Sequence, residues 1–381
     1  MTNEAFIGRR SAIGLWKETT RGQAVTPSVW INKLSWVLNP VTETATDDSW
    51  YGVIDENYDN FVTKNLSELD LEGIVKDSFI GYLFLGTLGS YTKCTVFKGS
   101  SVSGGTPARG DIESNGAVLK KIIVDGSDTY YLFDKPVTGT SVTDWTWTIT
   151  GAVDATVNAH FFEVLQNNNH PSFTLYDDDP VAASYAPYCM IDTFELSCAV
   201  EDYVKFSATF RGKQMQAQED ATITPTYTDE LPFTASMAWV RFADNEAWLN
   251  SASELCMQNF RISINKNLAD SQCFGDTDVA AIYNQQLGIE WDFEAIYNST
   301  TLRDIALNST KKAVRFYAKN DLASDLTAIY IDVMKAGLNE WTKTDNNNEI
   351  IRQTMWFVGQ YDNAAWASIE ILLLNGNSGT Y

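Results

Sequence analysis

The amino-acid sequence predicts a mainly β fold, with two tandem β-sandwich or barrel domains, each with a short flanking helix, and a small inserted β subdomain. Aromatic content is one reason, because the 12 Trp, 17 Tyr and 19 Phe suit half-buried pleated surfaces. A second reason is an alternating, strand-like segment that occurs twice. Length is the third, since 381 residues allow two domains that each bury a core. The 44% hydrophobic content excludes a disordered chain.

The repeated segment is a strand with one apolar and one acidic face. Residues 66–75 read LSELDLEGIV and residues 288–297 read GIEWDFEAIY, at an offset of 222 residues. A side-chain period of two places the apolar residues of each segment on one face and three carboxylates on the other. These carboxylates belong to Glu68, Asp70, Glu72, Glu290, Asp292 and Glu294.

A short helix is predicted directly after each of these strands. In the first, Asp77 and Ser78 are expected to cap a helix that buries Ile80, Leu83 and Phe84. In the second, Ser299 and Thr300 are expected to cap a helix that buries Leu302 and Ile305.

Two further matches extend the repeat at smaller offsets. SFTLY (172–176) resembles AVRFY (313–317) at an offset of 141, and residues 202–212 match residues 349–359 at an offset of 147. The fall of the offset from 222 to 141 means that the first copy contains 81 residues that the second copy lacks. Order and spacing therefore predict an internal duplication with an insertion in its first copy.

The resulting division assigns residues 1–90 and 156–215 to the first domain, and 91–155 to the insertion. Residues 216–230 form the linker and 231–381 the second domain. The insertion is rich in Gly, Ser and Thr and contains short strand-like runs. We expect it to be a small β subdomain that faces bulk solvent.

The net charge of −22 excludes adhesion to nucleic acid through clustered Lys and Arg. Two interpretations remain, solubility alone or a surface that repels DNA. The beginning MTNEAFIGRRSAIG has no apolar signal-peptide core, and the chain has no run of 18 apolar residues. We therefore expect synthesis in a cytoplasm without export, and no membrane contact.

The cysteines have no disulfide or zinc spacing, and reduced, buried thiols are expected. They are Cys94, Cys189, Cys198, Cys256 and Cys273. His160 and His170 have no partner cluster, so structural roles are expected for both. Asp177, Asp178 and Asp179 precede Pro180 and read as an acidic turn rather than a calcium loop. No cofactor or metal site is predicted.

Catalysis has one sequence-based argument in its favour. Paired carboxylates hydrolyse glycosidic bonds, and the Glu–Asp–Glu faces together with abundant Trp would suit a sugar. The same faces also fit an ordinary solvated strand, and their recurrence favours a shared structural role. No base, nucleophile and orienting group can be assembled from the sequence, so we predict that the protein is not an enzyme.

Two long segments, 39–65 and 269–286, occupy the same place in both copies and are predicted as loops. Long loops in compact domains are usually functional, and aromatic side chains suit protein–protein contact. The aromatic residues are Trp50, Tyr51, Tyr58 and Phe61 in the first segment, and Phe274 and Tyr283 in the second.

The chain resembles the tail tube proteins of long-tailed, non-contractile phages. Residues 8–38 resemble the start of that family, and contain a match to the pattern T-x-R-G-x-A-V-x-P. LSELDLEGIVKDSFIGYLFLGTLGS (66–90) is similar to its strand–helix unit. HPSFTLYDDDP (170–180) and FELSCAVEDYVKFSATFRGK (194–213) are similar to its closing strands.

The resemblance implies a virion protein that assembles into stacked rings, with packed β-sheets that join around a central channel for DNA ejection. A tandem member of the family implies trimeric rings with pseudo-sixfold symmetry, where single-domain members form hexameric rings. The six carboxylates are then candidates for the lumen wall, with the outer surface or a ring interface as the alternative. Segments 39–65 and 269–286 are candidates for ring stacking. Implied partners are further copies of the chain, other tail proteins such as the tape measure and the terminator, and passing DNA.

Two other interpretations stay open at this point. One is another virion component, a tail terminator or a decoration protein. The other is a carbohydrate-binding β-sandwich.

Overall fold

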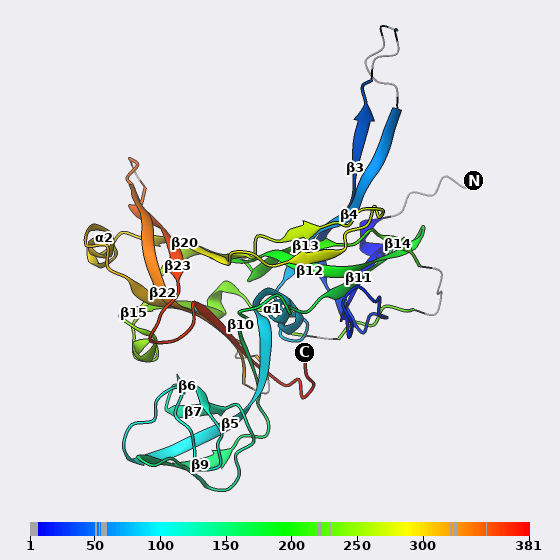
Figure 1. Ribbon diagram of the computed structural model, residues 1–381. Helices are drawn as coiled ribbons and strands as arrows, with labels where there is room; N and C mark the ends of the chain where they lie inside the picture. The colour runs from blue at the N-terminus through cyan, green and yellow to red at the C-terminus, as the bar shows by residue number, and fades with distance from the viewer. Residues whose placement is uncertain are drawn as a thin grey trace.

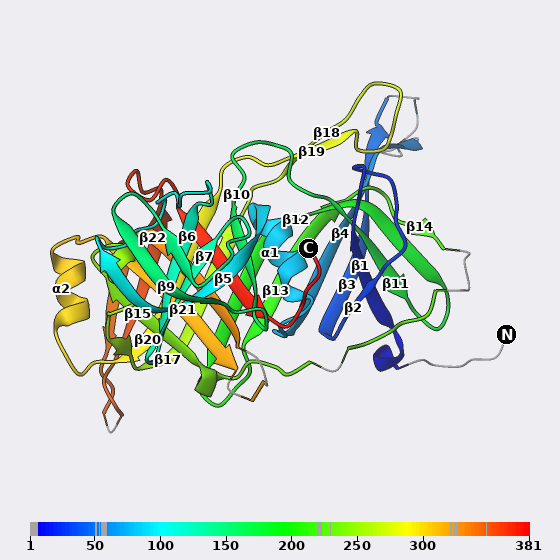
Figure 2. The same ribbon diagram turned by 90° about the horizontal axis from the view of Figure 1, so that it is seen from below.

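The structure is a computed structural model that describes residues 7–49, 52, 54, 59–218, 223–228, 230–320, 322–323, 326–347 and 349–381. Strands dominate these residues, and the two α-helices are short (Figures 1 and 2). No helix among the described residues is long and apolar enough to cross a membrane. The predicted mainly β fold is confirmed.

The strands before the second repeat are β1 (Ala12–Lys17), β2 (Val29–Ile31), β3 (Lys33–Asp47), β4 (Asp59–Ile74), β5 (Gly89–Gly104), β6 (Leu119–Asp125), β7 (Asp128–Phe133), β8 (Ser141–Thr143), β9 (Trp147–Val153), β10 (Asn158–Val164), β11 (Phe173–Asp178), β12 (Ala183–Ala199), β13 (Lys205–Gly212) and β14 (Gln216–Ala217). Those that follow are β15 (Ala238–Ala243), β16 (Glu254–Leu255), β17 (Met257–Asn265), β18 (Ala269–Ser271), β19 (Ala281–Tyr283), β20 (Gly288–Ile296), β21 (Lys312–Asn320), β22 (Thr327–Thr344), β23 (Arg352–Gln360) and β24 (Ile369–Asn375). The helices are α1 (Ile80–Leu88) and α2 (Thr301–Leu307), with 3₁₀ turns η1 (Gly8–Arg10), η2 (Ala235–Met237) and η3 (Glu246–Trp248).

One continuous antiparallel ladder runs through the molecule, and we call it the main sheet. Its order is β3–β4–β13–β12–β17–β20–β23–β22. The first four strands come from the part of the chain before residue 216, and the last four from the part after residue 256. The two parts meet where β12 pairs with β17, over Thr193–Asn265 to Ala199–Asn259.

A second layer of strands packs on one face of the main sheet. β12 and β22 are long, and their first portions leave the main sheet to pair with β11 and β14, and with β21 and β24. β1 extends the second layer beside β11, and β15 extends it beside β21. The main apolar core fills the space between the layers and includes Leu71, Phe194, Phe293 and Phe357. This arrangement is a β-sandwich, as predicted.

Register in the main sheet repeats at the offsets found in the sequence. Asp70 on β4 pairs with Thr209 on β13, and Asp292 on β20 pairs with Trp356 on β23. The first members of these pairs differ by 222 positions and the second members by 147. The two sets of four strands therefore have the same pairing geometry.

Both predicted helices are present, and their predicted core residues are buried. The predicted side-chain caps are wrong. α1 begins after Phe79 and α2 after Thr300, and neither has a side-chain capping hydrogen bond. α1 is buried along its whole length between the layers, so packing stabilises it without a cap.

The insertion is a small β subdomain with its own core, as predicted, but the expected position in bulk solvent is wrong. β5 passes from β10 into the subdomain, where it pairs with β7 and β9. β10 also pairs with β24, near the end of the chain. A shared apolar cluster fills the junction, with Ile123 from the insertion, Phe161 from β10, and Tyr330 and Leu372 from the second part. The subdomain is thus attached to the second part of the chain through a packed apolar face.

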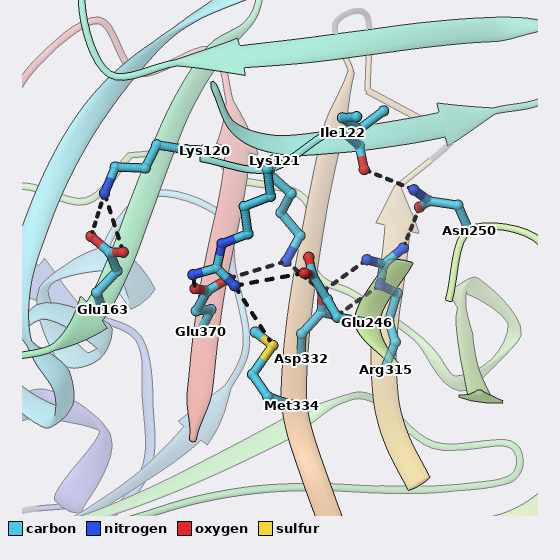
Figure 3. A network of polar contacts seen from close by, with 11 residues as sticks. Lys120, Lys121, Ile122, Glu163, Glu246, Asn250, Arg315, Asp332, Met334 and Glu370 are labelled. Carbon is cyan, nitrogen blue, oxygen red and sulfur yellow. Dashed lines mark hydrogen bonds and ion pairs between the residues drawn. The ribbon is translucent and has the colours of Figure 1, made fainter. Parts of the chain in front are cut away.

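A buried ionic network crosses this junction (Figure 3). Lys121 from β6 contacts Asp332 on β22, and both side chains are fully buried. Arg315 on β21 forms a two-pronged ion pair with the same carboxylate, with N···O distances of 2.7 and 2.8 Å. Burial alone would raise the pKa of Asp332, but Arg315 and Lys121 together hold it below its ordinary value.

The network continues on both sides of Asp332. Arg109, in the insertion, contacts Glu370 on β24 and lies 3.6 Å from Glu246. Asn250 accepts a hydrogen bond from Arg315 at 2.6 Å and donates one to the Ile122 carbonyl at 2.9 Å. Lys121 and Arg109 of the insertion are therefore paired with carboxylates of the second part.

Lys121→Met is expected to destabilise the protein by about 3–5 kcal/mol, because it leaves Asp332 buried with one fewer cation. Lys120→Met is the matched control. Lys120 is the next residue on β6, and its pair with Glu163 at 2.9 Å is partly solvated, so the loss should be at most about 1 kcal/mol. Urea unfolding followed by tryptophan fluorescence measures both, and equal losses would contradict the assigned role of Lys121.

Candidate functional site

The six predicted carboxylates lie on the face of the main sheet opposite the core. Glu68, Asp70 and Glu72 are exposed and alternate with buried Leu69 and Leu71. Glu290 is exposed, and Asp292 and Glu294 are half-buried, between buried apolar residues of β20. The alternation inferred from sequence is confirmed, and it gives the sheet one polar face.

Arginines from neighbouring strands pair with half of these carboxylates, and these pairs were not predicted from the sequence. Arg352 lies 2.6 Å from Glu294, and Arg261 lies 2.7 Å from Asp292. Arg211 lies 3.8 Å from Glu68. The hydrogen bond with Asp292 raises the pKa of Arg261 above its ordinary value. These pairs depend on cross-strand register, which a search within single segments does not reveal.

The other three carboxylates, of Asp70, Glu72 and Glu290, form no ion pair with any described residue. Glu195 on β12 adds a further carboxylate to the same face, 3.3 Å from Arg261. The polar face is therefore acidic, with arginines spaced among the carboxylates.

A row of paired residues runs straight across the polar face. Its members are Glu72, Ser207, Glu195, Ser263 and Glu290, each opposite the next. At the offset of 222, however, the counterpart of Glu72 is Glu294, four residues from Glu290 along β20. The ladder thus shifts by four residues for every four strands. With about 3.3 Å per residue and about 4.8 Å between strands, a closed barrel that repeated this shift would have strands tilted by about 35° from its axis.

Both ends of the main sheet present an open strand edge. β3 pairs with β4 alone among the described residues. From Gly337 onward β22 pairs with β23 alone in the described part of the chain. Open edges of this length offer unpaired N–H and C=O groups to another chain.

The two segments predicted as loops form β-hairpins instead. β3 and β4 continue through most of 39–65 as one long ladder, which reaches Asp47 opposite Asp59. This hairpin projects from the body of the molecule (Figure 1). β18 and β19 form a short hairpin within 269–286. Polar and β-branched residues on both faces explain why the alternation of the long hairpin was missed.

Three of the six predicted stacking aromatics are described by the structure. Phe61 and Tyr283 are exposed, and Phe274 is fully exposed. Trp50, Tyr51 and Tyr58 lie outside the described residues.

The two hairpins contact each other. Lys64 on β4 lies 2.6 Å from Asp270 on β18, with both side chains largely buried. The Asn65 amide donates to the Thr277 carbonyl at 2.8 Å, and Gln272 donates to the Thr63 carbonyl. β18 and β19 therefore support the base of the β3–β4 hairpin (Figure 2).

The two histidines and the acidic turn, which were also considered as candidate sites, have ordinary structural contacts. His160 and His170 are buried, and burial lowers the pKa of each to about 4. Asp179 accepts hydrogen bonds from the Val181 and Ala182 amides, as in the predicted acidic turn. Within the described ranges, no group of three His, Cys, Asp or Glu residues is arranged to hold a metal.

All five cysteines are free thiols, as expected. Cys94, Cys189 and Cys198 are buried, whereas Cys256 and Cys273 are exposed, so the expectation of burial is wrong for the last two.

The protein is thus a two-layer β protein that offers open strand edges at both ends of one sheet for pairing with further chains. Comparison with known sequences gives the particular group. The sequence profile of the phage tail tube protein family matches residues 8–333, and the chain belongs to this family. It is therefore a structural protein of the virion tail, and the family implies self-assembly into a tube. A comparison with curated proteins gave no match.

Lys64→Ala is expected to loosen the contact between the hairpins without unfolding the chain. Hydrogen exchange followed by mass spectrometry should show faster exchange at residues 60–66 and 270–280, because the Asn65 amide loses its support. Lys98→Ala is the control, since Lys98 forms an ion pair of equal length, 2.6 Å, with Asp128 in the insertion. Unchanged exchange at both hairpins in Lys64→Ala would contradict the supporting role.

Proposed function

We propose that the protein polymerises into stacked rings that form the tail tube of a long-tailed, non-contractile phage, the conduit for DNA ejection. Each ring contains three chains arranged with pseudo-sixfold symmetry. The observation that carries this proposal is the main sheet, which contains two sets of four strands with the same register and ends in two open edges.

The tandem arrangement is supported by the agreement between sequence offsets and register. Glu72 pairs with Ser35 on β3, and Glu294 pairs with Asn259 on β17, which defines an offset of 224 for β3 and β17. β12 and β22 correspond at an offset of 147, because Glu195 pairs with Ser207 and Thr342 pairs with Thr354. Each set thus contributes one domain to the tube wall, with domain limits near those inferred from sequence.

The internal junction supplies a template for the contact between chains. Within one chain, β12 of the first set pairs with β17 of the second, and Glu195 lies opposite Ser263. The counterparts of these strands at the open edges are β22 and β3. In the ring, β22 of one chain pairs with β3 of the next, with Thr342 opposite Asn39. This pairing covers both open strand edges, which would otherwise promote uncontrolled aggregation.

Closure after three chains gives a barrel of 24 strands, since each main sheet has eight. The tilt of about 35° that follows from the shift between the two sets lies at the lower end of the range for closed barrels. A barrel with this tilt needs no distortion of the register already present within one chain.

The polar face lines the lumen in this arrangement. α1, the second layer and the insertion all lie on the other side of the main sheet, where they form the outer wall (Figure 1). Glu68, Asp70, Glu72, Glu290, Asp292 and Glu294 then face the channel. A negative wall repels the DNA backbone, so the DNA passes without adhesion.

Ring stacking is assigned to the two hairpins in contact. The β3–β4 hairpin carries Phe61 away from the body, and β18–β19 carries Phe274 and Tyr283 beside its base. The proposal extends to Trp50, Tyr51 and Tyr58 between β3 and β4. The tape measure protein inside the tube and the terminator at its end are the further proposed partners.

A double variant tests the ring and its stoichiometry. Asn39→Cys with Thr342→Cys, with Cys256 and Cys273 replaced by Ser, should form disulfides between neighbouring chains in tubes. On denaturing, non-reducing gels the covalent ladder should end at three chains. Leu38→Cys with Thr342→Cys is the control, because adjacent residues of a strand point to opposite faces. A ladder that ends at six chains would contradict the trimer, and no cross-link in the test pair would contradict the register.

Reagent access tests the lumen assignment. Asp70→Cys is made in the chain with Cys256 and Cys273 replaced by Ser. It should react with maleimide-polyethylene glycol of about 5 kDa in free chains but only slowly in tubes, because a bulky reagent enters the bore only from its ends. Thr138→Cys, at an exposed position of the insertion, should react equally in both states. Equal reactivity of Asp70→Cys in free chains and tubes would place the acidic face outside.

A further inference from the structure

The segment just before β15 pairs with the first set of strands. The second set has no corresponding contact within the same chain. The Phe233 amide donates to the Val75 carbonyl at 3.2 Å, and the Val204 amide donates to the Phe233 carbonyl at 2.9 Å. The Ala235 amide donates to the Asp202 carbonyl at 2.9 Å. Residues 232–235 thus pair with the end of β4 and with the residues before β13. Phe233 is fully buried in the main core.

The corresponding place in the second set is present but uncovered. The Val75 amide donates to the Val204 carbonyl at 2.8 Å, and likewise the Tyr297 amide donates to the Ile351 carbonyl at 2.9 Å. Tyr297 and Ile351 are the counterparts of Val75 and Val204 at offsets of 222 and 147. Among the described residues, nothing bonds to the Tyr297 carbonyl or the Ile351 amide.

Burial differs between the two places in the same sense. Val75 and Val204 are 0% and 1% exposed, whereas Tyr297 and Ile351 are half-buried. Ile350, the counterpart of Tyr203, is 66% exposed. An apolar site with two open backbone groups remains in the second set.

The beginning of the chain corresponds in position to the segment that fills the site in the first set. η2 precedes β15 just as η1 precedes β1, and the residues read PFTASM (232–237) and AFIGRR (5–10). This alignment makes Phe6 the counterpart of Phe233, and Ile7 the counterpart of Thr234. Ile7 is 71% exposed in the single chain. Phe6 lies outside the described residues.

The beginning of the chain and this site lie at opposite ends of the molecule. η1 and β1 lie at one end of the molecule, whereas α2 and β23 lie at the other end, in both views (Figures 1 and 2). The beginning of a chain therefore cannot reach its own second set, but it lies next to the second set of the neighbouring chain in the proposed ring.

We propose that residues 5–8 of each chain insert into the second set of the adjacent chain in the ring. Phe6 then occupies the apolar site, its amide donates to the Tyr297 carbonyl of the neighbour, and its carbonyl accepts from the Ile351 amide. Ile7 lies opposite Ile350, as Thr234 lies opposite Tyr203. This inference rests on the proposed ring, and it explains two exposed isoleucines at opposite ends of the chain.

Phe6→Ala tests the contact. Isolated chains should keep the unfolding midpoint of the wild type, because Phe6 is expected to fill its site only in the ring. The concentration needed for tube formation, measured by light scattering and negative-stain microscopy, should rise at least tenfold. Phe233→Ala is the matched control and should lower the unfolding midpoint of the isolated chain, because the same contact forms there within the chain.

Cross-linking gives a second, independent measurement. Ile7→Cys with Ile350→Cys, in the background with Cys256 and Cys273 replaced by Ser, should link neighbouring chains in tubes. Tyr203→Cys with Thr234→Cys should form a disulfide within one chain and leave its mass on gels unchanged.

The outcomes separate this inference from the proposed ring. If Phe6→Ala assembles like the wild type and the Ile7–Ile350 pair does not cross-link, the inference is wrong, even where Asn39–Thr342 cross-links as expected. If wild-type chains form no tubes at all, the proposed function fails, and this contact fails with it.

Discussion

The pairing of β12 with β17 is the interaction on which the rest of the structure depends. Seven residue pairs, from Thr193–Asn265 to Ala199–Asn259, join two sets of four strands into one sheet. Backbone hydrogen bonds between strands specify register closely when one face is buried, because a slip of one residue would turn apolar side chains toward water. The same pairing places the carboxylates of both sets on one face and leaves an open strand edge at each end of the described sheet.

Strand pairing in the main sheet is not the only contact that holds the two parts of the chain together. β10 pairs with β24, and the apolar cluster around Phe161 and Leu372 provides the free energy of burial. The network around Asp332 adds orientation, because buried charges are tolerated only when each finds its partner. The subdomain is therefore firmly attached to the second part of the chain.

Arginines on the polar face offset part of its negative charge. Carboxylates that stand close together repel one another, and arginines at 2.6 and 2.7 Å from Glu294 and Asp292 reduce this cost within the second set. Asp70, Glu72 and Glu290 have no such partners among the described residues. The polar face therefore has more carboxylates than arginines.

The repeated acidic strands, the two short helices and the offsets of the repeat could be predicted from the sequence, because they follow from side-chain period and local order. The contacts between segments far apart in the sequence could be known only from the folded chain. The arginines beside Glu68, Asp292 and Glu294, the junction around Lys121 and Asp332, and the open edges of β3 and β22 all depend on strand pairing across long separations. The β3–β4 hairpin was predicted as a loop because a ladder with two polar faces has no periodic signature in the sequence.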